Sequence, residues 1–319
     1  MKKLLKNGLN YLPMKLIKNL FIGLRYRHWS ILEAFAYFLK GFSRETNLLK
    51  KPFYKFHLNV QKRKYTKVIN SEQVIDFNGI LLPNIYTDIS YANVVPAGFD
   101  ESFFIFLHLN DDYNPQNFHY VEKHLNESPY CYSDGNFNVI VEEKDIVIDA
   151  GAWIGDFSAY AAHKKALVYA FEPFKPTCDI LKRTANLNKT IIPVEYGLSD
   201  AVFTSYLQIN SPAGHDNSII SKEEIKDGDN VEEIRLTTID DFVRENNLEK
   251  VDFIKADIEG YERNMLLGAK ETLKKFAPKL AICTYHLPDD KEVLRKIILD
   301  ANSNYTIVQK YNKLFAQVL

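Results

Sequence analysis

The sequence predicts an α/β protein with a doubly wound, mostly parallel sheet. From about residue 138, short apolar runs alternate with helical patterns. These runs are continuous rather than alternating in hydrophobicity, which is typical of parallel strands buried on both faces. With 319 residues, 46% of them hydrophobic and 25% charged, the chain also has the composition of a soluble globular protein with a sizeable core.

The expected elements of this sheet follow the chain in order. Its strands are predicted at 145–150, 167–172, 191–196, 251–256 and 280–285. Helical patterns at 175–188 and 260–276 lie between them. The final runs YTIVQ and LFAQVL predict a C-terminal antiparallel pair at the sheet edge.

One insertion interrupts the alternation, at residues 201–236. It holds two β-prone runs, VFTSYLQI and VEEIRL, separated by the polar loop SPAGHDNS. We expect an extra hairpin over the ligand end of the sheet. His215 in the polar loop fits either a lid residue over an acceptor or an ordinary solvated loop residue.

Two segments of different character precede the sheet. Residues 71–137 form a small β-rich lead-in, in which Asn78-Gly79 predicts a hairpin turn and FFIFLHL a short buried strand. Residues 1–70 form a basic helical N-terminal extension, and residues 138–319 the main domain. The extension contains sixteen Lys or Arg and two acids, whereas the rest of the chain carries 24 basic and 39 acidic side chains.

The N-terminal extension is expected to be retained and not to cross a membrane. Lys15 and Lys18 interrupt the apolar segment of a would-be signal peptide. Its longest stretch without Lys or Arg is twelve residues, against about 20 for a membrane span. Its apolar helix faces either pack on the rest of the protein or attach residues 1–41 to an anionic membrane surface. Three scattered cysteines indicate neither a disulfide framework nor a zinc site, so a cytoplasmic setting fits.

The residues that follow the predicted strands indicate the kind of ligand. The carboxyl ends of parallel strands meet at one edge, where ligands bind. Asp149 and Glu172 lie at the ends of two of the strands, Asp257 and Glu259 follow a third, and His286 follows a fourth. So many acids disfavour a pyrophosphate. They favour a cationic ligand with a ribose diol, a description that S-adenosylmethionine meets.

Several motifs in order carry a family resemblance. DIVIDAGAWIGDFSAYAA, VYAFEP, YGLSD, LTTIDDFV, VDFIKADIEGYERNMLLGAKETL and PKLAICTYH together resemble the FkbM-type S-adenosylmethionine-dependent methyltransferases, over roughly residues 138–310. The resemblance implies a class I methyltransferase (Rossmann-like) fold and transfer of a methyl group to a hydroxyl of a macrolide, sugar or other glycan. Trp153 departs from the family pattern, which usually has Asn there, and we expect its ring to border the donor pocket.

The resemblance and the strand ends together give the candidate site. The predicted cofactor contacts are Asp149, Gly151, Trp153, Gly155, Glu172, Leu198, Ser199 and Asp257. A hydroxyl acceptor needs a base, for which Asp257 and His286 are the candidates. Asp257 could instead orient the donor or acceptor, or cap a helix. Glu259 could join the site or only stabilise the first turn of a helix.

Two neighbouring features complete the site prediction. Lys255 lies within a buried strand and is expected to pair with a site carboxylate rather than act as a catalytic amine. Asp257 and Glu259, two residues apart, are too common a pattern to predict a metal ion, and we expect none.

The leading function is therefore an O-methyltransferase acting on a sugar of a surface glycan or glycolipid. One alternative acceptor is a small-molecule metabolite. A different class of protein, one that binds nucleic acid through the basic arm, is disfavoured by the acidic main domain, and no nucleic-acid partner is expected. The oligomeric state is left open.

Overall fold

The computed structural model describes residues 66–77, 79–84, 130–210, 217–310 and 312–319. The chain divides into two compact units, Met1–Lys67 and Val68–Leu319. The second unit holds almost all of the described residues. Within the described residues, no helix is long and apolar enough to cross a membrane. The predicted N-terminal helices and the predicted strand FFIFLHL lie outside the described residues.

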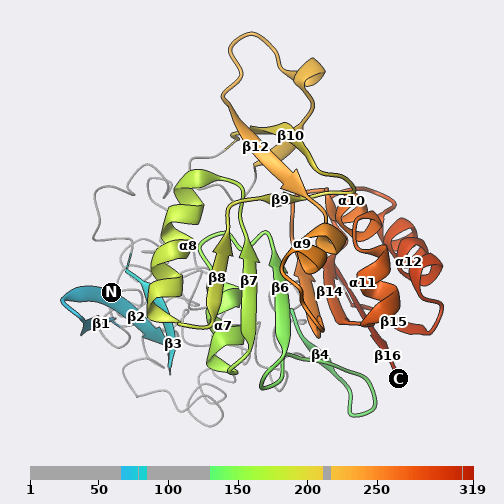
Figure 1. Ribbon diagram of the computed structural model, residues 1–319, viewed down its shortest axis with the longest axis horizontal. Coiled ribbons are helices and arrows are strands. Elements are labelled where there is room, and N and C mark those ends of the chain that lie inside the picture. Colours follow the sequence, from blue (N-terminus) through green and yellow to red (C-terminus); the bar gives the residue numbers. More distant parts are fainter. Residues whose placement is uncertain (1–65, 78, 85–129, 211–216, 311) are drawn as a thin grey trace, which may run out of the picture. The chain divides into compact units, whose positions relative to one another are not determined.

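A seven-stranded sheet forms the centre of the second unit (Figure 1). Its strands in spatial order are β15 (Tyr305–Lys310), β16 (Lys313–Val318), β14 (Lys279–Cys283), β13 (Phe253–Ala256), β6 (Ile146–Ala150), β7 (Leu167–Phe171) and β8 (Ile191–Val194). The five predicted strands are all present. They pair in parallel, and β16 pairs antiparallel with β14 and β15. The predicted parallel sheet with a C-terminal antiparallel edge is confirmed.

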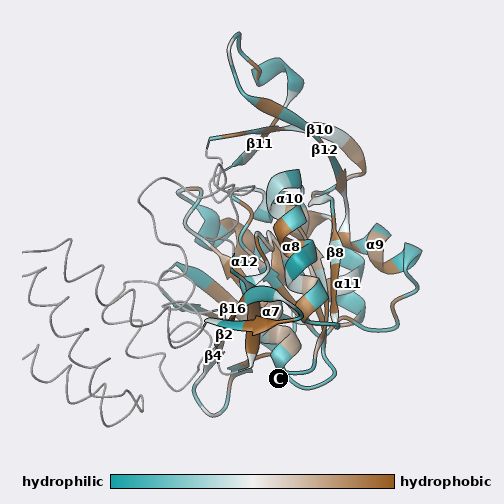
Figure 2. Cartoon of the chain, turned by 90° about the vertical axis from the view of Figure 1, so that its left-hand side faces the viewer, coloured by the Kyte–Doolittle hydropathy of each residue, from teal (hydrophilic) through white to brown (hydrophobic). Residues whose placement is uncertain are grey.

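The helices form two groups. On the side of the sheet that also carries the β2–β3 hairpin lie α7 (Asp156–His163) and α8 (Lys175–Leu187), both of which contact β3. The second group comprises α9 (Ile239–Glu245), α10 (Glu262–Leu267), α11 (Lys270–Lys275) and α12 (Asp290–Ala301). In this group α12 contacts α10 and α11, and α11 also contacts α9. Figure 2 shows hydrophilic residues on the outward faces of several helices and hydrophobic residues on the strands between them.

The predicted helix at 260–276 is instead two helices, α10 and α11. Gly268 ends α10, and a Cβ at this position would lie 2.1 Å from the carbonyl oxygen of Ser199. The two helices thus separate where the backbone must pass close to the 197–199 segment, a long-range contact that the helical pattern does not reveal.

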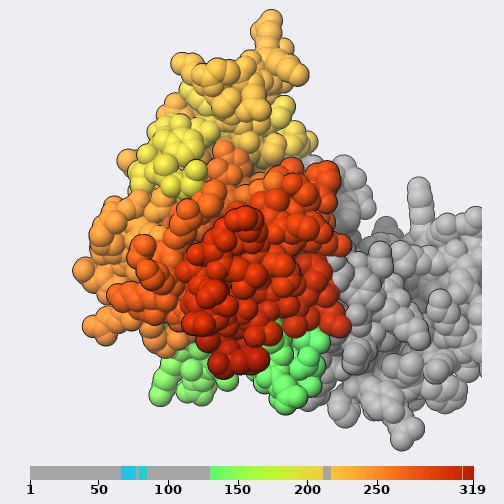
Figure 3. Space-filling model, turned by 90° about the vertical axis from the view of Figure 1, so that its right-hand side faces the viewer, coloured from blue at the N-terminus to red at the C-terminus, as the bar shows by residue number. Residues whose placement is uncertain are grey.

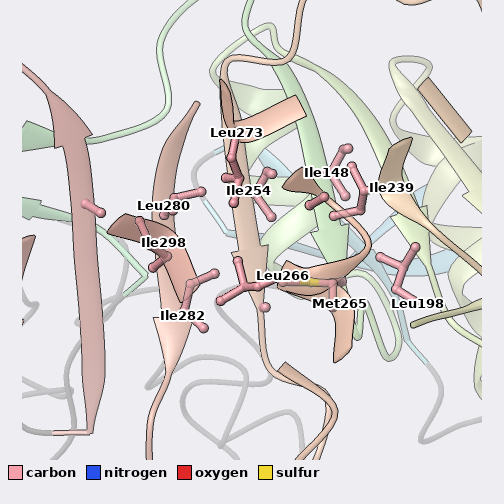
Figure 4. Close-up of a cluster of buried hydrophobic side chains, with 14 of the residues drawn as sticks. Ile148, Leu198, Ile239, Ile254, Met265, Leu266, Leu273, Leu280, Ile282 and Ile298 are labelled. Atoms are coloured by element: carbon pink, nitrogen blue, oxygen red, sulfur yellow. The ribbon is translucent and has the colours of Figure 1, made fainter. Parts of the chain in front are cut away.

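A large apolar cluster joins the second helix group to the sheet. Ile148 and Ile254 from the strands meet Ile239, Met265 and Leu273 from the helices (Figure 4). All five side chains are fully buried. Burial contributes about 1.5–3 kcal/mol for each aliphatic side chain, so this interface stabilises the packing of the helices on β6 and β13.

The insertion forms a projecting sheet at the carboxyl ends of the strands. It consists of β9 (Gly197–Leu198), β10 (Phe203–Gln208), β11 (Ser218–Ile220) and β12 (Val231–Thr237), with a 3-10 turn at Lys222–Glu224. Antiparallel pairing of β10 with β12 confirms the predicted hairpin, while β11 is an additional strand. Figures 1 and 3 show this flap, coloured yellow to gold, standing beyond the main domain. His215, for which a lid role and a solvated loop position were both left open, lies outside the described residues.

The lead-in segment contains the predicted hairpin. Here β2 (Glu72–Phe77) pairs antiparallel with β3 (Ile80–Pro83) around Gly79, whose N–H donates to Asp76 Oδ1 at 2.7 Å. Among the described residues, this segment also contains β4 (Tyr132–Ser133), while β1 (Thr66–Ile69) precedes it and β5 (Asn138–Val139) begins the main domain.

Candidate active site

The loop after β6 is shaped by two glycines with left-handed backbones. Gly151 has φ +73°, and a Cβ there would lie 2.0 Å from the carbonyl oxygen of Asp257. Gly155 has φ +87° and precedes α7, where a Cβ would lie 2.7 Å from Leu181. Both positions combine a conformation that L-residues avoid with close packing. The two glycines of the predicted donor loop are therefore required by the fold itself.

Trp153 lies between these glycines and is half-buried. Its φ of +50° is a left-handed conformation that is rare for a bulky residue. Its backbone N–H donates to Glu172 Oε2 at 2.9 Å. Trp153 thus keeps a backbone conformation that glycine adopts readily, and the hydrogen bond to Glu172 holds it.

Glu172 follows β7 and connects the two loops. Its Oε1 accepts from the Phe174 N–H at 2.9 Å, so each carboxylate oxygen already binds one backbone donor. Burial raises its pKa to about 7, although these two hydrogen bonds, another from Thr177 and the charge of Lys255 act in the opposite direction. An acceptor-only carboxylate has further lone pairs for hydroxyl donors.

Asp149 is fully buried and faces the interior of the loop. Its Oδ1 pairs with Lys255 Nζ at 3.0 Å, and its Oδ2 accepts from Ser158 Oγ at 2.6 Å. Lys255 also donates to the carbonyl oxygen of Gly151 at 2.6 Å. The ion pair expected of Lys255 is present. The side chain of Asp149 has no exposed surface and shapes the loop through Lys255, while its contact with the donor stays a prediction.

Leu198 and Ser199 are likewise enclosed, with 2% and 0% of their surface exposed. Ser199 N–H donates to the carbonyl oxygen of Thr237 at 2.8 Å, and its Oγ donates to Asp200 Oδ1 at 2.9 Å. Both residues anchor the flap at β9 rather than presenting side chains to a ligand. Their contact with the donor stays a prediction.

Asp257 follows β13 and retains partial exposure, 21% for its side chain. The hydroxyl of Tyr130 makes a short hydrogen bond to its Oδ2, and the hydroxyl of Tyr285 donates to its Oδ1 at 3.0 Å. Burial acts to raise the pKa of this carboxyl, but Lys255, Lys313 and the Tyr130 hydrogen bond together hold it below its usual value. Asp257 is therefore a carboxylate at neutral pH and a weak base.

Tyr130 was not predicted from the sequence. Its ring lies under two ammonium groups, with Lys313 Nζ 4.5 Å and Lys255 Nζ 5.1 Å from the ring centroid. These residues come from the lead-in segment, from β16 and from β13. No local pattern connects positions so distant along the chain.

His286 lies among three carboxylates, and its side chain is 7% exposed. Its Nε2 is 3.5 Å from Asp257 Oδ1 and 3.3 Å from Glu259 Oε2, and its Nδ1 is 3.0 Å from Glu262 Oε1. Burial lowers the pKa of the imidazole, but Glu259, Glu262 and Asp257 outweigh that and raise it to about 10. An imidazole already protonated at neutral pH cannot accept a proton, so the geometry does not favour His286 as the base.

Glu262 is a further residue that the sequence reading missed. It is 0% exposed and accepts hydrogen bonds from the N–H groups of Ile258 at 2.9 Å and Gly260 at 3.1 Å. It thereby fixes the loop that carries Glu259. Its position at the start of α10 is that of an ordinary helix-stabilising acid, so no sequence pattern distinguishes it.

Residues 149–307 match the model of the methyltransferase FkbM domain. The chain belongs to the FkbM methyltransferase family. It is a methyltransferase, and its fold is that of class I methyltransferases, as the sequence predicted.

Two curated relatives and one solved structure are similar to this methyltransferase. The hexuronic acid methyltransferase AglP of Haloferax volcanii is 27% identical over 173 residues, which are 54% of this chain and 68% of AglP. The AMB antimetabolite synthetase AmbE of Pseudomonas aeruginosa is 30% identical over 189 residues, 45% of this chain but only 9% of AmbE. The crystal structure of methyltransferase FkbM from Methylobacillus flagellatus has a TM-score of 0.44 and 21% identity, with 73% of this chain and 60% of that chain covered.

Proposed function

We propose that this methyltransferase uses S-adenosylmethionine to methylate a hydroxyl group of a sugar in a surface glycan or glycolipid. The observation that carries the proposal is the pairing of a donor loop held by Glu172 with the partly exposed carboxylate of Asp257 on the adjacent strand end. The similarity to the hexuronic acid methyltransferase AglP supports a sugar acceptor.

The donor side of the site fits S-adenosylmethionine. Glu172 can accept a hydrogen bond from a ribose hydroxyl, because an ionised carboxylate has about four acceptor sites and this one binds two backbone N–H groups and Thr177. Gly151, Trp153 and Gly155 give the loop its sharp turn, and we propose that the Trp153 ring borders the adenosine. When bound, the donor supplies an electrophilic methyl group on a sulfonium.

The acceptor side has to orient a hydroxyl and draw its proton away. Asp257 is an ionised acceptor held by Tyr130 and Tyr285, so it can take a hydrogen bond from the incoming hydroxyl and align its oxygen. His286 and Glu259 fix the far side of that carboxylate. The residues proposed to act on the acceptor remain Asp257, His286 and Glu259, with Asp257 in direct contact.

The remaining parts of the proposal concern the rest of the chain. We propose a basic extension at 1–70, a β-rich segment at 71–137 and a catalytic domain at 138–319, a division supported by the family match within the third part. We also propose that the protein is cytoplasmic and that residues 1–41 contact the anionic inner face of the membrane, given their basic amphipathic pattern.

A methyl-labelled donor incubated with fractionated glycan, lipid, small-molecule, nucleic-acid and protein acceptors from the source cell tests the function. We expect label in glycan or glycolipid, and a loss of about 100-fold or more for Asp257→Asn. Asp179→Asn, which changes an exposed carboxylate on α8, serves as the matched control. Label found only in small molecules would show that the acceptor is a metabolite and not a glycan. Label found only in protein or nucleic acid would overturn the proposal.

A further inference from the structure

The acceptor end of the site holds three acids around one imidazole. Asp257 and His286 follow neighbouring parallel strands whose ends are in register at Ala256 and Ile282. Glu259 and Glu262 come from the loop and helix between those strands. All of these side chains are brought together by the β13 to β14 crossover, at the edge of the sheet where the donor loop lies.

The imidazole of His286 is buried without a hydrogen bond at either nitrogen. Its side chain is 7% exposed, and both Nδ1 and Nε2 lack a hydrogen-bonding partner of acceptable geometry. Carboxylate oxygens nevertheless lie 3.0 Å from Nδ1 and 3.3 Å from Nε2. Buried polar groups are normally hydrogen-bonded, and an exception calls for an explanation such as an ion. These carboxylate oxygens lie close to the two ring nitrogens but form no hydrogen bond of acceptable geometry with them.

The spacing of these atoms suits a metal ion. One ligand atom from each of Asp257, Glu262 and His286 lies within 4.8 Å of the others. Metal–ligand bonds of about 2.0–2.2 Å place the ligand atoms of one ion at most about 4.0–4.4 Å apart, so these side chains would move closer together on binding an ion. The backbone hydrogen bonds to Glu262 would hold that ligand in place, as is usual around metal sites.

The donor set also indicates which class of ion. Two carboxylates and one imidazole suit a divalent first-row transition ion, whereas sites made only of oxygen atoms suit Mg²⁺ and Ca²⁺. Glu259 lies beside the set with 31% of its side chain exposed, and Asp257 is also partly exposed. An ion there would keep open positions on the side from which an acceptor approaches.

We propose that Asp257, Glu262 and His286 bind a divalent transition-metal ion of the Mn²⁺ or Zn²⁺ class, which displaces the proton that the neighbouring acids otherwise hold on the imidazole. This inference deepens the proposed function and rests on it for the ion's role, which is to bind the acceptor hydroxyl and lower its pKa. The sequence led us to expect no metal, because Asp257 and Glu259 alone are a weak pattern. In the tertiary structure the set is instead three residues, Asp257 and His286 from two strand ends and Glu262 from the start of α10.

Binding of Mn²⁺ to the chelator-treated full chain tests this site directly. Electron paramagnetic resonance should show loss of the free-ion signal with about one ion bound per chain, and Zn²⁺ should displace it. His286→Gln should weaken Mn²⁺ binding about tenfold or more. Asp257→Asn should also weaken Mn²⁺ binding about tenfold or more, and it leaves in place the groups that form the loop's hydrogen bonds to Glu262. Glu195→Gln, an exposed carboxylate paired with Lys182, should bind Mn²⁺ as the unchanged chain does.

Donor binding is measured on the same samples by calorimetry, and circular dichroism checks that each variant is folded. Mn²⁺ binding that is absent, or that is unchanged in folded His286→Gln and Asp257→Asn, would overturn the metal site while leaving donor binding and methyl transfer in place. Saturable Mn²⁺ binding lost in both variants supports the site. It would do so even if no acceptor were methylated, so failure of the proposed function is distinguished from failure of the site.

Discussion

The donor side and the acceptor side of the site are built in different ways. On the donor side, the polar groups after β6 and β7 are paired within the protein: Asp149 with Lys255 and Ser158, and Glu172 with two backbone N–H groups. On the acceptor side, acids crowd around His286, whose nitrogens have no hydrogen bond.

This difference separates shape from reactivity. A donor that is already activated needs a loop of fixed shape, which internal pairing provides. An acceptor hydroxyl needs a charged environment, and charges that are incompletely paired remain available to it. If internal pairing makes the donor loop rigid, variants that remove a paired or closely packed group there should have measurable effects on stability or donor binding.

Removal of the buried cation should have the largest effect. Lys255→Met leaves Asp149 as an unpaired charge in the core and should reduce the free energy of unfolding by about 3–5 kcal/mol. Denaturant unfolding measures this. Lys182→Met removes an exposed ion pair on α8 and should cost about 0–1 kcal/mol. Equal losses in the two variants would show that the donor half does not depend on its buried pair.

Gly151 tests the close approach of the two strand ends. Gly151→Ala and Gly135→Ala both place a Cβ on a left-handed backbone, at a cost of about 1–2 kcal/mol. Only at Gly151 would the Cβ meet the Asp257 carbonyl oxygen, since nothing lies within 4 Å of it at Gly135. Gly151→Ala should therefore lose about 1–3 kcal/mol more in thermal or denaturant unfolding. A similar loss for both would refute the contact.

Glu172 predicts a pH dependence of donor binding. Its pKa is raised to about 7 by burial, so the carboxyl is neutral below that pH and ionised above it. The ionised form accepts hydroxyl hydrogen bonds and attracts a cation, so donor affinity should fall as pH falls through about 7, by up to about tenfold per pH unit. Calorimetric titration at several pH values measures this. Glu172→Gln should bind more weakly and show little pH dependence, whereas an unchanged slope would exclude Glu172.

Trp153 should give the smallest effect. If its ring borders the donor, Trp153→Ala should weaken binding of S-adenosylmethionine by about 0.5–1.5 kcal/mol, because a stacked aromatic surface is lost. Trp153→Phe keeps an aromatic ring and should retain most of the affinity. Equal affinity in both variants, by calorimetry, would show that Trp153 contributes only its backbone to the donor loop.

The sequence anticipated much of the fold because its signals are local. The parallel strands, the 201–236 insertion and the C-terminal pair each follow from runs of apolar residues, and all are present. The single helix expected at 260–276 was wrong, because Gly268 meets Ser199 across the fold. Local periodicity carries no information about such a backbone contact.

The sequence predicted which residues gather at one edge of the sheet, but not the contacts that they make there. Strand ends predicted that Glu172, Asp257 and His286 would lie at one edge, because parallel strands end together. Whether a carboxylate faces a ligand or the interior depends on packing, and so the burial of Asp149 and Ser199 could not be read from their positions along the chain.

The sequence by itself determined the family, the parallel sheet and the choice of acids over phosphate-binding features, since these depend on residue type and order. The tertiary structure alone decided which of those acids are paired. It brought Tyr130 and Lys313 to Asp257, and Glu262 to His286, over separations of 127 residues in the case of Tyr130 and Asp257. Hydrogen bonding and charge act over a few ångströms, and only folding sets those distances.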